Sequence, residues 1–162
     1  VMLPQNFDYS AATLTNGKLL SEWAKKGVRR INGDILPNLD IESWLIVPAG
    51  HNGPAFAVYS NFRRIMRWNN SILYAISIGH LSDRLLGLGP ISVPRPKNDR
   101  RVSIEKVKEI QAKLNSLGYS TGRPDGVFGK NTRSAIRAYQ KRINVPADGY
   151  LTMELWELLM QE

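Results

Sequence analysis

Apolar residues recur at the spacing of an amphipathic helix in three stretches of the last third of the chain. Residues suited to helix ends flank these stretches, because Ser103 and Thr152 can cap a helix and Gly118 can end one. The apolar positions are Ile104, Val107, Ile110, Leu114 and Leu117; then Ala135, Ile136, Tyr139 and Ile143; then Leu155, Trp156 and either Leu158 or Leu159. This pattern predicts three short helices around one apolar core.

The dipeptide Asp-Gly precedes two of these helices, as Asp125-Gly126 and as Asp148-Gly149. An aspartate side chain can accept hydrogen bonds from the backbone that follows it, and a glycine can adopt a positive φ. The sequence therefore predicts two tight turns, which fold three helices into a bundle of two related half-units. Phe128 and Thr132, which follow the first turn, are assigned to the same structural role.

The chain before residue 88 has a mixed pattern, and it makes α+β the predicted fold class. Residues 3–10 suggest extended backbone, and residues 15–30 suggest a short helix that ends near Gly27. Residues 43–60 hold two apolar runs around a connection rich in Pro, Gly and Asn, which favours a β-hairpin.

Two more helices are expected after the hairpin. Asn61 precedes the first of them, and a long amphipathic helix follows over residues 69–87. Asn69, Asn70 or Ser71 can cap this second helix, and Gly87 can end it.

The stretch from Gly87 to Arg101 contains three prolines and two glycines, "GLGPISVPRPKNDRR", and cannot continue a helix. It predicts a linker over residues 89–102. The linker would separate one domain over residues 1–88 from another over residues 103–162.

Composition narrows the possible functions. The chain has 162 residues, a net charge of +8 and no cysteine, which excludes disulfides, thiolate metal sites and cysteine nucleophiles. The positive charge is spread along both halves, which suits any polyanionic partner, including a carboxylate-rich cell wall or an anionic membrane surface. Three short helices in a chain of net charge +8 can also mimic a nucleic-acid binder, but no recognition helix concentrates the charge, and no nucleic-acid partner is predicted.

Several kinds of chemistry find no support in the sequence. His51 and His80 have no metal-ligand spacing, and no phosphate loop or nucleophile elbow occurs, so we predict no metal and no cofactor. The carboxylates before residue 100 lie in polar surroundings, unlike the apolar pocket of a glycosidase acid. No apolar run reaches membrane-spanning length, and the initial Val1 suggests that the chain begins inside a longer product.

One stretch, "RWNNSILYA" from Arg67 to Ala75, has two amides, a hydroxyl and two aromatics at the start of a helix. It can be a helix cap with core aromatics beside it. It can also be a sugar-binding wall, in which aromatic rings stack on a pyranose and amides bind its hydroxyl and acetamido groups.

Residues 47–85, "VPAGHNGPAFAVYSNFRRIMRWNNSILYAISIGHLSDRL", resemble the C-terminal part of the catalytic domain in the membrane-bound lytic transglycosylase B family. The stretches "LPQNFDY" and "EWAKKGVRR" also resemble segments of that family, so the resemblance covers about residues 1–88. Residues 103–160, with "VKEIQAKLNSLGY", "DGVFGKNTRSAIRAYQ" and "VPADGYLT", resemble the three-helix peptidoglycan-binding domain.

The resemblance implies a mostly helical, lysozyme-like domain with a small β-sheet. Such enzymes cleave the bond between N-acetylmuramic acid and N-acetylglucosamine without water and leave a 1,6-anhydromuramic end. One glutamate acts as acid and then as base, and in the family it lies far upstream of the matching run. Glu22 and Glu42 stand in the wrong sequence neighbourhoods, so we expect no catalytic residue in this chain.

The resemblance also implies substrate-binding positions. Asn69 matches the family asparagine that faces the substrate, Tyr74 matches a cleft tyrosine, and Trp68 replaces another cleft tyrosine. In the second domain, Tyr119, Arg123 and Arg137 are the candidates for binding the wall, because its stem peptides carry carboxylates.

Two functions remain open from the sequence. The chain can be a fragment of a lytic transglycosylase with its wall-binding module, or a non-catalytic peptidoglycan-binding protein that acts alone. Both functions predict that the chain binds glycan strands and stem peptides. Both also predict a monomer that is located in the periplasm. An N-terminal segment outside this chain could attach it to the membrane.

Overall fold

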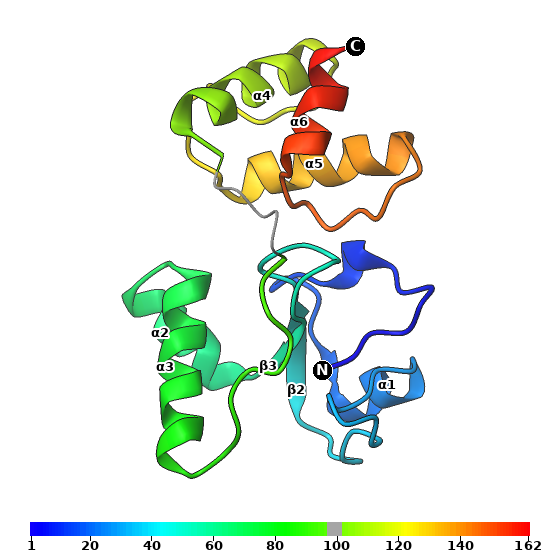
Figure 1. Cartoon of the computed structure of the whole chain (residues 1–162), viewed down its shortest axis with the longest axis vertical. Helices are drawn as coiled ribbons and strands as arrows, with labels where there is room; N and C mark the ends of the chain where they lie inside the picture. Colours follow the sequence, from blue (N-terminus) through cyan, green and yellow to red (C-terminus); the bar gives the residue numbers. More distant parts are fainter. Residues whose placement is uncertain (97–101) are drawn as a thin grey trace. The chain divides into compact units, whose positions relative to one another are not determined.

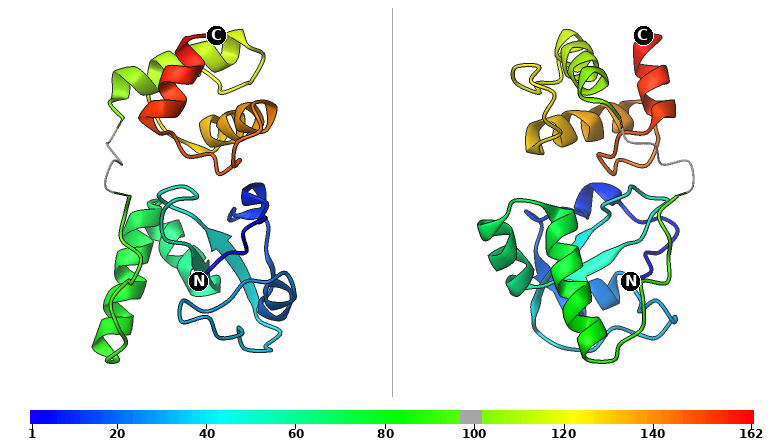
Figure 2. Two further views of the ribbon diagram at one scale, coloured as in Figure 1. Left: turned by 45° about the vertical axis from the view of Figure 1, so that its right-hand side comes forward. Right: turned by 60° about the vertical axis from the view of Figure 1, so that its left-hand side comes forward.

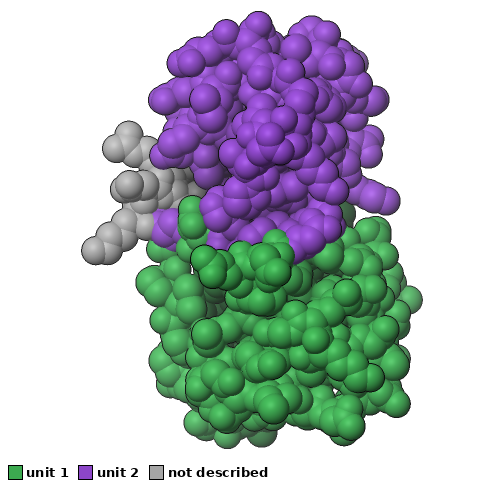
Figure 3. All heavy atoms as spheres, turned by 90° about the vertical axis from the view of Figure 1, so that its right-hand side faces the viewer, with its two compact units in different colours: residues 1–7, 11–48, 52–95 green, residues 8–10, 49–51, 96–162 purple. Residues whose placement is uncertain are grey.

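The computed structural model describes residues 1–96 and 102–162 (Figure 1). It divides into two compact units, which are coloured in Figure 3. Unit 1 comprises Val1–Phe7, Ala11–Pro48 and Asn52–Arg95; unit 2 comprises Asp8–Ser10, Ala49–His51 and Pro96–Glu162. Residues 97–101, in the predicted linker, lie outside the described residues.

The sheet is small and antiparallel, with the order β1-β2-β3. Strand β2 (Glu42–Ile46) pairs with β1 (Lys18–Leu19) on one side and with β3 (Phe56–Val58) on the other, where Trp44 lies opposite Val58. The predicted hairpin is therefore confirmed. Helices α1 (Leu20–Lys25), α2 (Ser60–Trp68) and α3 (Ile72–Leu85) complete this part of the chain and confirm the α+β class.

Successive side chains of β2 point to opposite faces of the sheet, and both faces are buried. Trp44 and Ile46 point to the side of α2 and α3, where they pack with Val58, Phe62 and Ala75. Leu45 points the other way, and Figure 1 shows α1 and α3 on opposite sides of the sheet. On the α1 side, the indole of the fully buried Trp23 donates a hydrogen bond to the carbonyl oxygen of Ser43.

The expectation of extended backbone over residues 3–10 is wrong for most of that segment. Only Met2, just before it, forms a β-bridge, with Arg29. The chain then turns, with the Phe7 N–H bonded to the Pro4 carbonyl, and forms a short 3-10 helix, η1 (Tyr9–Ala11). The carboxylate of Asp8 accepts hydrogen bonds from the backbone and hydroxyl of Ser10, which favours a turn over a strand.

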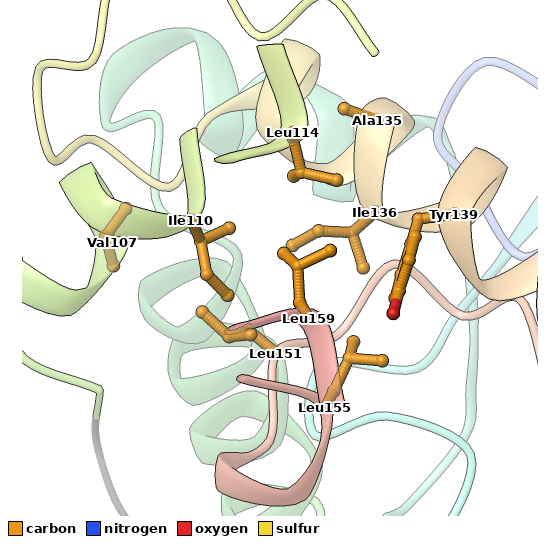
Figure 4. Close-up of a cluster of buried hydrophobic side chains, with 9 residues drawn as sticks. All are labelled: Val107, Ile110, Leu114, Ala135, Ile136, Tyr139, Leu151, Leu155 and Leu159. Atoms are coloured by element: carbon orange, nitrogen blue, oxygen red, sulfur yellow. The ribbon is translucent and has the colours of Figure 1, made fainter. Parts of the chain in front are cut away.

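Unit 2 contains the three predicted helices, α4 (Ile104–Ser116), α5 (Lys130–Arg142) and α6 (Met153–Met160), which Figure 2 shows from two directions. Ser103 and Thr152 cap α4 and α6 as predicted. The buried core, drawn in Figure 4, consists of Val107, Ile110, Leu114, Ala135, Ile136, Tyr139, Leu151, Leu155 and Leu159. Leu159, and not Leu158, is therefore the core residue of that pair.

A buried glutamine holds the first Asp-Gly turn. Gln111, 1% exposed in the middle of α4, donates its side-chain N–H to Asp125 Oδ1 at 2.9 Å and accepts the backbone N–H of Gly126 at 2.8 Å. Asp125 Oδ1 also accepts the N–H of Val127. The hydrogen bond from Gln111 is the main cause of the lowered pKa of Asp125.

The second Asp-Gly turn repeats this arrangement. Gln140, 4% exposed on α5, donates to Asp148 Oδ1 at 2.7 Å and accepts the N–H of Gly149 at 2.8 Å. Asp148 Oδ1 accepts the N–H of Tyr150. Both glycines have positive φ, as predicted. Unit 2 therefore consists of two half-units, each with one helix whose glutamine binds the turn that follows it.

We predict that Gln111→Leu destabilises unit 2 by about 2 kcal/mol, because the half-buried N–H of Gly126 and the buried hydroxyl of Thr132 lose their partner. The measurement is urea-dependent hydrogen exchange of peptides from residues 103–162. Glu109→Leu, at an exposed position of the same helix, is the matched control. Equal protection in the two variants would contradict this role of Gln111.

Candidate functional site

The junction between α2 and α3 is built from backbone hydrogen bonds. Asn69 ends α2 by donating its N–H to the carbonyl of Ile65 at 3.0 Å, and its own carbonyl accepts the N–H of Ser71 at 2.7 Å. Ser71 then caps α3, since its hydroxyl accepts the N–H of Tyr74 at 3.2 Å. Of the three residues that could cap this helix, Ser71 is the one that does.

This geometry leaves the Asn69 side chain exposed, and none of its atoms takes part in a hydrogen bond within the described residues. The amide therefore keeps two donors and an acceptor for another molecule. Helix capping does not explain why an asparagine stands at this position.

Two aromatic side chains lie next to Asn69. The rings of Trp68 and Tyr74 are 6.1 Å apart between centroids and tilted by 37°. Trp68 is 81% exposed, which is far from the core position that a structural role would require, and Tyr74 is half-buried. The structure thus brings the rings of Trp68 and Tyr74 together at the junction that also holds Asn69, whose side chain is exposed.

A separate cavity of about 390 Å³ lies elsewhere in unit 1, between β3, α2 and α3. Its lining includes Phe56, Phe62, Ile76 and His80. None of the three junction residues lines it, so this cavity and the candidate sugar-binding wall are different places.

The two glutamates considered from the sequence are both exposed. Glu22 accepts the N–H of Leu19 at the start of α1, and Glu42 lies exposed on β2. A glycosidase acid needs a raised pKa. Four other carboxyl groups have a lowered pKa, chiefly because hydrogen bonds stabilise their charged form: Asp8, Glu105, Asp125 and Glu162.

Residues 1–96 and 102–162 also contain no cluster of three His, Asp or Glu side chains that could hold a metal ion. In the same part of the chain, no helix has both the length and the apolar character needed to cross a membrane.

The three candidates in unit 2 are not brought together by any contact between them in the described structure. The ring of Tyr119 packs edge-on against Tyr139, with centroids 6.2 Å apart, and Arg123 is exposed in the loop after α4. Arg137 lies against Gly149, and a residue two positions from Tyr139 points to a different side of α5.

Arg137 is the most distinctive of these three. Its Nε is buried without a hydrogen-bond partner, and burial lowers the pKa of its guanidinium. Arg133, one helical turn earlier, has a lowered pKa for the same main reason. Two cations on one side of a helix with an unused buried donor are suited to binding a carboxylate. Sequence analysis did not identify Arg133 as a candidate. Its spacing of four residues from Arg137 on a predicted helix places both cations on one side, and this could have indicated it.

Two family models match the chain. One is described as "Transglycosylase SLT domain" and matches residues 1–83, just over half of the chain. The other is described as "Putative peptidoglycan binding domain" and matches residues 103–159.

The chain is similar to SltB3 from Pseudomonas aeruginosa, solved in complex with NAG-anhNAM-pentapeptide. The two are 44% identical with a TM-score of 0.93, over 98% of this chain and 43% of that chain. A second SltB3 structure, in complex with NAG-NAM-pentapeptide, gives a TM-score of 0.92 with the same identity and coverage. The chain therefore spans less than half the length of these solved chains.

Curated relatives match over shorter stretches. The spore cortex-lytic enzyme of Bacillus cereus is 37% identical over 62 residues, which are 38% of this chain and 24% of that protein. The N-acetylmuramoyl-L-alanine amidase CwlM of Mycobacterium tuberculosis is 42% identical over 45 residues, which are 28% of this chain and 11% of that protein.

We predict that Ser71→Ala lowers the stability of unit 1 by about 1 kcal/mol, because α3 loses its capping hydroxyl. Asn69→Ala should change stability by less than about 0.5 kcal/mol, since an exposed side chain without partners is removed. Chemical denaturation of the two variants and the wild type measures both effects. A larger loss for Asn69→Ala than for Ser71→Ala would mean that Asn69 is the structural residue.

Proposed function

The chain belongs to the transglycosylase SLT domain family, and from this premise we propose that it is part of a lytic transglycosylase of the membrane-bound B type. Residues 1–88 would form the C-terminal part of the catalytic domain, residues 89–102 a linker, and residues 103–162 a peptidoglycan-binding module. The match of 103–159 to a peptidoglycan-binding family supports the last assignment.

The proposed reaction cleaves the β-1,4 bond between N-acetylmuramic acid and N-acetylglucosamine. A glutamic acid gives its proton to the glycosidic oxygen, so that the bond from that oxygen to C1 of the muramic residue breaks. The resulting carboxylate takes the proton of the C6 hydroxyl as O6 bonds to C1, which forms the 1,6-anhydro ring without water. The complex of SltB3 with an anhNAM ligand supports this reaction type.

The acid for this reaction would come from outside these 162 residues. The observation that supports this is the exposure of Glu22 and Glu42, neither of which lies in the apolar pocket that a general acid needs. The contribution of this chain would be to bind and position the substrate.

The α2–α3 junction would form one wall of the sugar-binding cleft. The exposed indole of Trp68 and the ring of Tyr74 would stack on pyranose faces, while the amide of Asn69 would bind an acetamido or hydroxyl group. The single observation that carries this assignment is the Asn69 side chain, which is exposed and unpaired because Ser71 provides the cap.

Unit 2 would bind stem peptides of the wall through carboxylate recognition. Arg137 is the preferred contact, because Arg133 lies one helical turn away and the two guanidinium groups can bind one carboxylate together. Arg123 and Tyr119 are secondary contacts. The module would act in the periplasm as part of a monomer, with membrane attachment through a segment outside this chain.

A second candidate is a non-catalytic peptidoglycan-binding protein that acts as this chain alone. The match of residues 103–159 to a peptidoglycan-binding family favours it, because such a module binds the wall without an acid. The two candidates differ in one measurable property, which is the activity of the complete gene product.

We predict that the complete product of the gene releases 1,6-anhydromuramyl products from purified sacculi, whereas the 162-residue chain releases none. Mass spectrometry of the soluble products is the measurement. An inactive gene product that still binds sacculi would support the non-catalytic candidate. Anhydro products from the 162-residue chain would show that it contains an acid.

Within that experiment, Asn69→Ala should lower kcat by roughly 10- to 100-fold, since an amide that binds the transition state is lost. The adjacent and exposed Asn70→Ala is the matched control and should leave kcat unchanged. Equal effects of the two substitutions would contradict the proposed role of Asn69.

We also predict that Arg137→Ala reduces the retention of residues 103–162 on insoluble sacculi by roughly tenfold, as expected for a lost charge-assisted hydrogen bond. Lys141→Ala, which removes an exposed charge one turn further along α5, serves as the control. Equal retention of both variants would show that binding depends only on net charge.

A further inference from the structure

Two hydrogen-bond donors at the end of α5 bind a carboxylate of the chain itself. Tyr139 and Arg142 are three residues apart on α5 and therefore lie on the same side of that helix. The guanidinium of Arg142 lies over the ring of Tyr139, 5.1 Å from its centroid. Tyr139 donates its hydroxyl to Glu162 Oε1 at 3.3 Å, and Arg142 donates Nη2 to Glu162 Oε2. We call these two donors the Tyr139–Arg142 site.

The fold of unit 2 holds both donors in place. Tyr139 is 1% exposed within the core, and Figure 4 shows its hydroxyl oxygen at the end of the ring farthest from α5. Burial raises the pKa of Tyr139, so the hydroxyl keeps the proton that it donates. The ring of Tyr119 packs edge-on against the same ring. A guanidinium over a fixed ring, beside a fixed hydroxyl, is arranged in advance for one carboxylate.

Glu162 is an occupant that another carboxylate can replace. Helix α6 ends at Met160, so Glu162 lies beyond it and can move without unwinding the helix. The side chains of Arg142 and Glu162 are 47% and 30% exposed, so a second molecule can reach the guanidinium. The hydrogen bond from Arg142 is the main cause of the lowered pKa of Glu162, which means that the site favours a charged carboxylate. Ion pairs this exposed are weak, because water screens them.

We propose that the Tyr139–Arg142 site binds a carboxylate of a peptidoglycan stem peptide, and that Glu162 occupies the site until this ligand displaces it. In the exchange no covalent bond changes, and the two donors pass their hydrogen bonds from Glu162 to the ligand. The match to the peptidoglycan-binding family covers residues 103–159, which include both donors but not Glu162.

This inference rests on the proposed function and deepens it. It adds a second carboxylate subsite to the module, on another side of α5 from Arg137, together with an internal competitor for that subsite. It also gives Tyr119 a place, because its ring contacts Tyr139 and not Arg137.

The test measures binding of the soluble NAG-NAM-pentapeptide, the ligand of one SltB3 complex, to the 162-residue chain. The dissociation constant is taken from the NMR amide signals of Tyr119, Tyr139 and Arg142. Glu162→Gln removes the charge of the competitor, so the dissociation constant should fall by about two- to fivefold. Glu157→Gln removes the same charge from an exposed position on α6 and should leave the constant unchanged.

Substitution of the donors should have the opposite effect. Arg142→Gln should weaken binding by roughly tenfold, as expected for a lost charge-assisted hydrogen bond. Lys130→Gln, which removes an exposed charge at the other end of α5, is the matched control. Tyr139→Phe should weaken binding by about two- to fivefold, because one hydrogen bond is lost while the ring stays in the core. The pentapeptide with its carboxylates amidated should leave the three amide signals unchanged.

Equal dissociation constants for Glu162→Gln and Glu157→Gln would overturn the proposal. A lower Tm of Glu162→Gln with unchanged affinity would also overturn it, and would make Glu162 a structural link between α6 and α5. Binding that shifts signals around Arg137, but not those of Tyr139 and Arg142, would refute this site and leave the proposed wall binding intact. If no variant binds the pentapeptide or sacculi, the proposed role of unit 2 fails together with this inference.

Discussion

The folding of unit 2 depends on two buried primary amides. The chain that follows a helix can leave it in many directions. The side-chain amides of Gln111 and Gln140 fix this direction, because each acts as a hydrogen-bond donor and as an acceptor. Each donates to the aspartate of an Asp-Gly turn and accepts from its glycine. Because both amides are almost fully buried, their own donors and acceptors have no water to bind, and each turn is fixed relative to its helix. The apolar core then fills the space that these two contacts define.

The sequence predicted those features that depend on residues close together along the chain. The three helices of unit 2, the caps Ser103 and Thr152 and the β2–β3 hairpin are all signalled within a few residues. The role of Gln111 could not be predicted in this way, because its partner is 14 residues away and the contact exists only after folding. The segment over residues 3–10 was predicted wrongly because the hydrogen bonds of Asp8 outweigh a weak extended pattern.

At the candidate site, too, the sequence could not predict which side chains contact one another after folding. A family resemblance placed Trp68, Asn69 and Tyr74 at a cleft, and the sequence left three residues as possible caps of α3. Only the three-dimensional arrangement distinguishes them, since the hydroxyl of Ser71 takes the cap and the side chain of Asn69 is left without a partner. The exposure of Leu81 and Leu85 on α3 could not be predicted for a related reason: helical spacing reveals apolar positions, but their exposure depends on what else packs against the helix.

The amide contacts in unit 2 also bear on the chemical lifetime of the chain. Asp-Gly is a labile dipeptide, because the glycine nitrogen can attack the aspartate side chain and close a succinimide ring, which leads to isoaspartate. In both turns the glycine N–H is held by a glutamine oxygen, and the aspartate carboxylate is held by the same glutamine and by a backbone N–H. The two groups that would have to react are thus fixed to other partners. The aspartates at these two sites should therefore isomerise more slowly in the folded unit than in the unfolded chain.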